Sequence, residues 1–134
     1  MTRRTCLVLA AAAAAPFVSA QSEDAARKAA EKWLGLIDQG KYKDAYKQSS
    51  QYMRAQATAE EWEPQIRAMR EGAGDMQSRN FSSAKVTKQM AGAPDGDYMV
   101  LEYNTALTKK GKAVETVMMS SEGGGWKTAG YFIR

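Results

Sequence analysis

The sequence predicts a fold of the α+β class, in which N-terminal helices pack on one face of a four-stranded antiparallel meander sheet. Two observations lead to this prediction. From residue 22 to about residue 74, apolar residues recur at helical spacing in three successive segments. From residue 76 to residue 134, four strand-like segments are separated by short turns rich in Gly, Pro and Lys. Helices that precede strands, rather than alternate with them, favour an antiparallel sheet.

The first twenty residues are expected to be a cleavable signal peptide. Two arginines begin the segment, an Ala-rich apolar run follows, and small residues fit cleavage after Ala20. The run is shorter than the roughly 20 apolar residues of a transmembrane helix, and we expect no such helix in the chain. Residues 21–134 then form a single domain, periplasmic or secreted. Paired arginines also occur in twin-arginine signals, but Cys6 and Val8 favour the ordinary secretory route.

The composition excludes several kinds of chemistry. The chain has no His, and its single Cys lies in the signal segment, which excludes Ser-His and Cys-His catalysis, disulfides, and thiolate or imidazole metal sites. Two of the 19 basic residues fall in the first twenty, which leaves 17 basic against 15 acidic residues. That excess is too small to indicate nucleic acid as a partner. We expect no metal and no other cofactor.

The first two predicted helices form a hairpin. One covers residues 22–39, with Trp33 on its apolar face, and Gly40 ends it. The other begins directly after this glycine and runs to about Met53, with Tyr42 on its apolar face. Because the connection is so short, the two helices are expected to pack antiparallel.

A third helix is predicted to begin at the capping box of residues 58–61 and to end at residues 72–74. Pro64 is the irregular position, because it lies beyond the first turn and removes a main-chain hydrogen bond. Two interpretations fit the sequence. The helix kinks at Pro64, or it starts later with Pro64 as its first residue. The kink is favoured.

Four strands are predicted in the second half of the domain. The first covers residues 76–90 and bends near Ser82, and the others cover residues 98–107, 113–121 and 126–134. The connecting segments GAPDGD, KKGK and GGG are typical of tight turns. Connections this short place consecutive strands side by side, which predicts the meander.

The last strand differs from the others because large apolar residues occupy both of its faces. By simple alternation Trp126 and Phe132 share one face, and Tyr131 and Ile133 share the other. One face packs under the helices, and the other is left as an apolar patch that marks an interaction site. Gly130 indicates a bulge, which would change the side chains that point inward. Trp126 and Phe132 are the candidate interface, with a second copy or an envelope protein as partner.

Acid–base chemistry would have to use tyrosine and carboxyl groups. Tyr42, Tyr46 and Tyr103 can project into a pocket between helices and sheet, and Glu115 would have to share that pocket. An apolar pocket raises the pKa of a carboxyl group and makes it a proton donor. The alternative is that these tyrosines are core and rim residues. The alternative is favoured.

Arg79 and Arg70 complete the set of candidate residues. A guanidinium group is a planar fork that binds carboxylates through two hydrogen bonds. Either arginine can therefore pair with Glu115 or Asp38 and orient the helices against the sheet, or it can hold an anionic ligand. The structural role is favoured because neither arginine lies in a basic cluster.

Several short motifs recur together in a known family. They are Trp33-Leu34, Asp38-Gln39-Gly40, the run from Gly92 to Tyr98, and the ending from Trp126 to Arg134. In these motifs the chain resembles DUF4019, a bacterial family of exported domains of unknown function. The resemblance implies a cone-like fold similar to the superfamily of nuclear transport factor 2 and ketosteroid isomerase, in which helices cap a curved sheet. It implies no active site.

The sequence therefore favours an exported envelope protein that acts as a non-catalytic binding or scaffolding module and self-associates through its sheet. The absence of catalytic residue sets and the two-sided last strand support this interpretation. The alternative is a small-ligand binder or an acid–base enzyme that uses a pocket inside the cone. The sequence identifies no ligand.

Overall fold

The computed structural model describes residues 20–134. The expected signal peptide lies outside the described residues except for Ala20, so its cleavage and the export route stay predictions. Within the described part of the chain, no helix is both long enough and apolar enough to cross a membrane.

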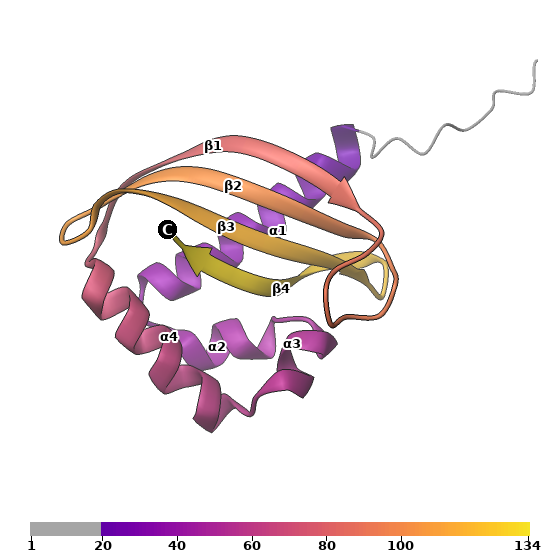
Figure 1. Cartoon of the computed structure of the whole chain (residues 1–134), viewed down its shortest axis with the longest axis horizontal. Coiled ribbons are helices and arrows are strands. Elements are labelled where there is room, and N and C mark those ends of the chain that lie inside the picture. Colours follow the sequence, from indigo (N-terminus) through magenta and orange to yellow (C-terminus); the bar gives the residue numbers. More distant parts are fainter. Residues whose placement is uncertain (1–19) are drawn as a thin grey trace, which may run out of the picture.

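The domain has the predicted α+β architecture, with helices before strands (Figure 1). The sheet is antiparallel in the order β1-β2-β3-β4, which is the predicted meander. The helices lie on one face of this curved sheet, with α1 behind the strands in the view of Figure 1. The elements are α1 (Ala20–Asp38), α2 (Tyr42–Lys47), α3 (Gln51–Gln56), α4 (Ala59–Ala73), β1 (Met76–Thr87), β2 (Tyr98–Leu107), β3 (Gly111–Glu122) and β4 (Gly125–Ile133).

Helix α1 packs against the sheet through the apolar face expected from its spacing. Ala26, Ala30, Trp33 and Ile37 are all buried. The Trp33 indole N–H donates to the carbonyl of Ala45, at 3.0 Å, and to a serine hydroxyl of the next segment. The same side chain thus fills the core and fixes α2 against α1.

The prediction of a single helix after Gly40 is wrong, because the structure has two helices there, α2 and α3. The break lies at Ser49 and Ser50. The main-chain N–H of Ser50 donates to the carbonyl of Thr128 on β4 at 2.7 Å, a bond that a continuous helix would not allow. The Ser50 hydroxyl accepts a hydrogen bond from the main-chain N–H of Met53 at 3.0 Å and so caps α3.

Helix α4 begins at the predicted capping box and continues through Pro64. The Thr58 hydroxyl accepts a hydrogen bond from the Glu61 N–H at 3.2 Å and donates to the Glu61 carboxylate at 3.0 Å. These contacts stabilise the first turn, so the interpretation in which the helix starts at Pro64 is wrong.

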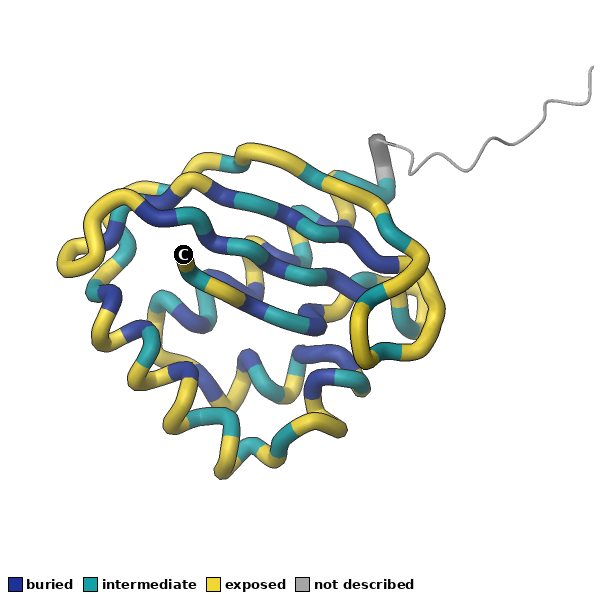
Figure 2. Tube along the Cα trace, in the orientation of Figure 1, coloured by how far each residue is buried: buried dark blue, intermediate teal, exposed yellow. Residues whose placement is uncertain are grey.

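The sheet buries one face and exposes much of the other. Along β2 the residues Met99, Leu101, Tyr103, Thr105 and Leu107 are buried, and the residues that alternate with them are less so. The same alternation runs along β3 (Figure 2). The pairing of β1 with β2 shifts between Phe81 and Ser83, where the bend was expected. We call the buried face, which packs against the helices, the inner face, and the opposite one the outer face.

A bulge in β4 changes which of its side chains point inward. Met119 pairs with Thr128 and Met118 pairs with Gly130, so Ala129 is an extra residue in the ladder. Simple alternation therefore fails at this point, as the glycine had indicated. A Cβ atom on Gly130 would lie 2.5 Å from the Met118 Cε atom, which shows how closely Met118 covers the bulge.

The bulge separates the two residues expected at an interface. Trp126 lies before it and packs against the core, whereas Phe132 lies after it and is 55% exposed. Tyr131, next to Phe132, points inward and is buried. Only Phe132 of the predicted pair is therefore left on the outer face.

Candidate functional site

Asp38, the last residue of α1, is held by two arginines from different elements. Its Oδ1 atom accepts hydrogen bonds from Arg70 Nη1 on α4 and Arg79 Nη2 on β1, both at 3.0 Å. Its Oδ2 atom accepts one from Arg79 Nη1 at 2.8 Å. A carboxylate at a helix C-terminus is disfavoured by the helix dipole. The two guanidinium groups offset that repulsion and join α1 to α4 and to the sheet.

Glu115 lies at the centre of β3 and has no solvent exposure. Its carboxylate accepts hydrogen bonds from Arg79 Nε at 2.7 Å and Arg79 Nη2 at 3.1 Å. The Thr105 hydroxyl donates at 2.6 Å, and the Tyr131 hydroxyl also donates. Arg79 thus bridges Glu115 and Asp38, and the ion pairs expected for the two arginines are present.

The protonation of this network follows from its contacts. Burial raises the pKa of the Glu115 carboxyl, but hydrogen bonds from Arg79, Thr105 and Tyr131 outweigh burial, and the net pKa lies below the ordinary value. Burial likewise raises the pKa of Asp38, and the hydrogen bonds and charge of Arg79, with those of Arg70, bring it below the ordinary value. Both carboxylates are therefore charged at neutral pH.

The tyrosine and the arginines keep their protons. Burial and the neighbouring Glu115 carboxylate raise the pKa of Tyr131 far above its ordinary value. Burial lowers the pKa of Arg79, but its hydrogen bonds to Asp38 and Glu115 outweigh this and raise the net pKa. The two positive charges of the arginines balance the two negative charges of the carboxylates. The charges of the network are therefore satisfied within it, as expected for a structural role.

The hydrogen bonds that Glu115 accepts come from Arg79, Thr105 and Tyr131, and none comes from the three predicted tyrosines. Tyr42 is buried on α2, with the Arg67 guanidinium 5.1 Å from its ring centre. Tyr46 donates its hydroxyl to the carbonyl of Ala57 at 2.7 Å and ties α2 to the end of α3. Tyr103 pairs with Glu115 in the sheet register, and burial raises its pKa to about 12. Of the five candidate pocket residues, Arg79 and Glu115 are the two joined by hydrogen bonds.

Thr105 and Tyr131 are network members that sequence reasoning missed. Thr105 shares the inward parity of Tyr103, so a polar residue in a row of apolar ones was a usable signal. Tyr131 gave no such signal, because its inward direction depends on the bulge at Ala129.

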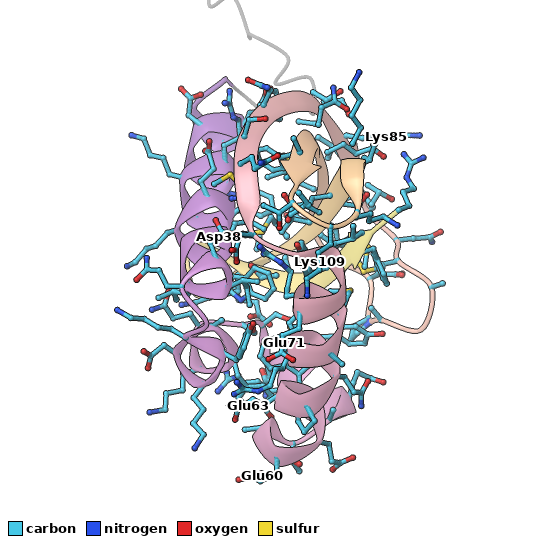
Figure 3. All side chains as sticks on the ribbon, turned by 90° about the vertical axis from the view of Figure 1, so that its left-hand side faces the viewer. Asp38, Glu60, Glu63, Glu71, Lys85 and Lys109 are labelled. Carbon is cyan, nitrogen blue, oxygen red and sulfur yellow. The ribbon has the colours of Figure 1, made fainter. Side chains whose placement is uncertain are left out.

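A shallow groove of about 230 Å³ lies beside the network, at the C-terminal ends of α1 and α4. Figure 3 shows Asp38, Glu71 and Lys109 around it. The acidic residues in its lining outnumber the basic ones, with Asp75 as the third acid beside Arg70 and Lys109. The groove therefore offers little attraction to an anion, although an arginine lines it.

The outer face of the sheet presents a second groove, of about 390 Å³. It crosses β1, β2 and β3 near the β2–β3 hairpin and reaches Arg134, the residue after β4. Its polar lining residues on this face are Ser78, Asn80, Asn104, Lys112 and Arg134. Phe132 lies one row away along β4, since it pairs with Thr116 and Arg134 follows it. This groove lies on the opposite side of the sheet from the buried network, although Thr105 of that network is among its lining residues.

A family model described as a protein of unknown function, DUF4019, matches residues 29–131 of the chain. The chain belongs to the DUF4019 family. No curated protein matches it. The match to DUF4019 includes every residue of the buried network, from Asp38 to Tyr131. Phe132 and Arg134 of the outer face follow directly after the matched DUF4019 region.

Proposed function

We propose that this DUF4019 domain is an exported, non-catalytic binding module that associates with a protein partner through the outer face of its sheet. The observation that carries the proposal is the contrast between the two faces. The charged groups of the inner face bind one another, whereas the outer face exposes Phe132 by 55%. Among residues 20–134 no helix covers that face (Figure 1). By the strand register, the half-buried Val114 and Met118 lie in the rows on either side of Phe132 on the same face. Contiguous exposed apolar surface of this kind marks candidate interaction sites.

The acid–base alternative has less support. A catalytic carboxylic acid needs a raised pKa and access to its substrate. Glu115 has a lowered pKa and no solvent exposure. The space that a pocket would need is filled by core side chains such as Trp33 and Leu101, which are 2% and 0% exposed.

The sheet face is better suited to association than the sheet edges. The carbonyl of Thr128 on edge strand β4 is occupied by Ser50. Edge strand β1 has a register shift near Ser82 and carries an exposed lysine, Lys85. Bulges and lysines are features that discourage the addition of another strand.

Export is the second part of the proposal and rests on the N-terminal segment. We propose that cleavage after Ala20 releases the domain into the periplasm, and that the domain has the cone-like fold suggested by its family resemblance. Expression of the full chain with a C-terminal tag tests the export. The expected product is a periplasmic protein whose mass corresponds to residues 21–134. An uncleaved cytoplasmic product would contradict it.

Site-specific photocrosslinking tests the binding surface. A benzoylphenylalanine at position 132 is compared with one at position 65, where the native Gln65 is exposed on α4. Irradiation in envelope extract is expected to give a discrete crosslinked protein from position 132 and none from position 65. Equal labelling from both positions, or none from position 132, would refute the proposal.

A further inference from the structure

The outer face of the sheet carries an excess of positive charge. By the strand register, Lys85, Lys112, Lys127 and Arg134 lie on this face, against two acidic residues, Glu102 and Glu122. Glu122 lies at the far end of β3 and accepts hydrogen bonds from the main-chain N–H of Gln51. Figure 3 shows Lys85 on the sheet and Glu60, Glu63 and Glu71 along α4. Residues 20–74, which form the helices, contain nine basic and nine acidic residues, so the outer face of the sheet carries a local positive excess that the helical side does not.

The groove of about 390 Å³ concentrates this charge together with amide groups. Asn80 and Asn104 pair directly across β1 and β2, and Lys112 and Arg134 provide the charged side chains of the lining. No acidic residue lines the groove within the described chain. Val114 lies between the amides and Arg134 and gives the groove an apolar floor.

These groups match the chemistry of a peptide that carries carboxylates. Guanidinium binds carboxylate through two parallel hydrogen bonds, and ammonium binds it as a point charge. Asparagine amides donate to, and accept from, main-chain peptide groups. The exposed Phe132 beside the groove provides an apolar contact for a neighbouring side chain.

We infer that this groove binds the carboxylate side chains of an acidic segment in a protein partner. The inference rests on the proposed function, since the groove is part of the outer face. A second copy of the domain is a poorer occupant, because two such faces would bring like charges together. A lipid bilayer is flat and would not fill a groove between strands. Both are outcomes that the test below distinguishes.

Glu102 provides a second test of the inference, in which a substitution is expected to strengthen peptide binding and not to weaken it. Its carboxylate accepts a hydrogen bond from Arg134 Nη2 at 3.2 Å, so an internal acid already occupies part of the Arg134 guanidinium. Glu102 and Arg134 are 33% and 68% exposed, so neither is needed for the core. A partner carboxylate would compete with Glu102 for this group. Removal of the Glu102 charge should therefore strengthen the binding of an acidic peptide.

Fluorescence anisotropy with a labelled hexaglutamate peptide at low salt tests the groove, with hexaglutamine as the neutral probe. The wild-type domain is expected to bind hexaglutamate and not hexaglutamine, with affinity that falls as salt rises. Lys112→Gln and Arg134→Gln are each expected to weaken binding about tenfold. Glu102→Gln is expected to strengthen it about twofold to fivefold.

Lys28→Gln is the matched control, because it removes the same charge from an exposed position on α1. This variant should bind hexaglutamate within about twofold of wild type. If Lys28→Gln and Arg134→Gln weakened hexaglutamate binding equally, the binding would depend only on the overall charge of the domain, and the inference would be overturned. Binding to phosphatidylglycerol vesicles or to polyphosphate, without binding to hexaglutamate, would also overturn it. The inference would also be overturned if the Arg134→Gln substitution promoted dimer formation and hexaglutamate did not reverse it.

The two proposals can fail separately. Failure of hexaglutamate binding, with crosslinking from position 132 intact, overturns the carboxylate site and keeps the binding face. Loss of the position-132 crosslinks, with peptide binding intact and dependent on Arg134, overturns the proposed function and keeps the groove.

Discussion

Arg79 Nε lies 2.7 Å from Glu115 Oε1, and this contact ties β1 to β3 across the inner face of the sheet. Strand β2 lies between the two residues, and its Thr105 donates to the same carboxylate. A buried ion pair adds little stability over an apolar pair of similar size, but loss of one partner leaves a buried charge uncompensated. The network is therefore sensitive to single substitutions.

Glu115→Gln should destabilise the domain strongly. The amide keeps the shape of the side chain, but it leaves Arg79 with one carboxylate instead of two and presents an NH₂ group to other donors. The expected loss is about 3–5 kcal/mol in the free energy of unfolding, measured by urea denaturation. Glu102→Gln, at the exposed pair with Arg134, is the control and should cost less than about 1 kcal/mol. Equal effects of the two substitutions would show that the buried network is not special.

Stability should fall in acid. The pKa values of Asp38 and Glu115 lie below their ordinary values of 3.8 and 4.5, which they regain on unfolding. As pH falls, the unfolded chain therefore binds protons before the folded chain does. The stability that these two carboxylates contribute is fully present above their ordinary pKa values and is lost as pH falls through their folded pKa values. Urea midpoints measured between about pH 6 and pH 2 should decline below about pH 4.5. Glu115→Gln should flatten this decline, and an unchanged slope would contradict the assignment.

Gly74→Ala and Gly72→Ala should have opposite effects, although the two positions are separated by one residue. Gly74 has a φ of +90°, and a Cβ there would lie 2.2 Å from Thr108 Oγ1 and 2.7 Å from the Lys109 main-chain nitrogen. Gly74→Ala should cost at least about 2 kcal/mol. Gly72 is helical, and a Cβ there would meet nothing within 4 Å beyond the backbone of its own helix, so Gly72→Ala should stabilise by about 0.5–1 kcal/mol. Thermal unfolding of both variants measures the contrast, and shifts of the same sign would refute it.

Gly130→Ala should show energetic coupling to Met118. The new methyl group would meet the Met118 Cε atom at 2.5 Å, and this flexible side chain has to move away from the bulge. We expect a cost of about 1 kcal/mol in the wild-type background. In a Met118→Ala background the cost should shrink. A double-mutant cycle measures the coupling, and strict additivity would mean that Met118 does not cover the bulge.

The architecture could be predicted from the sequence because it depends on local patterns. The apolar face of α1 around Trp33, the capping box at Thr58 and the turns between strands each involve residues that are close in sequence. The family resemblance was also predictable, because its motifs are short and fall in order along the chain. These features need no knowledge of long-range contacts.

The features that the sequence got wrong or left open all involve contacts between distant residues. The break between α2 and α3 depends on a hydrogen bond from Ser50 to Thr128, which no local pattern near Ser50 reveals. The direction of Tyr131 depends on an extra residue in β4. The pairing of Arg79 with both carboxylates was one of several open choices, since only the folded chain brings Asp38 and Glu115 to the same guanidinium.

The same separation in sequence has a consequence for folding kinetics. The contacts of Arg79 with Asp38 and Glu115 span 41 and 36 residues of chain. Closing such long loops is slow, and a carboxylate buried before its arginine arrives would be unstable. We therefore expect the four charged groups to meet late, after the sheet and α1 have come together. Their interactions then govern how slowly the folded domain opens, and they have little influence on how fast it forms.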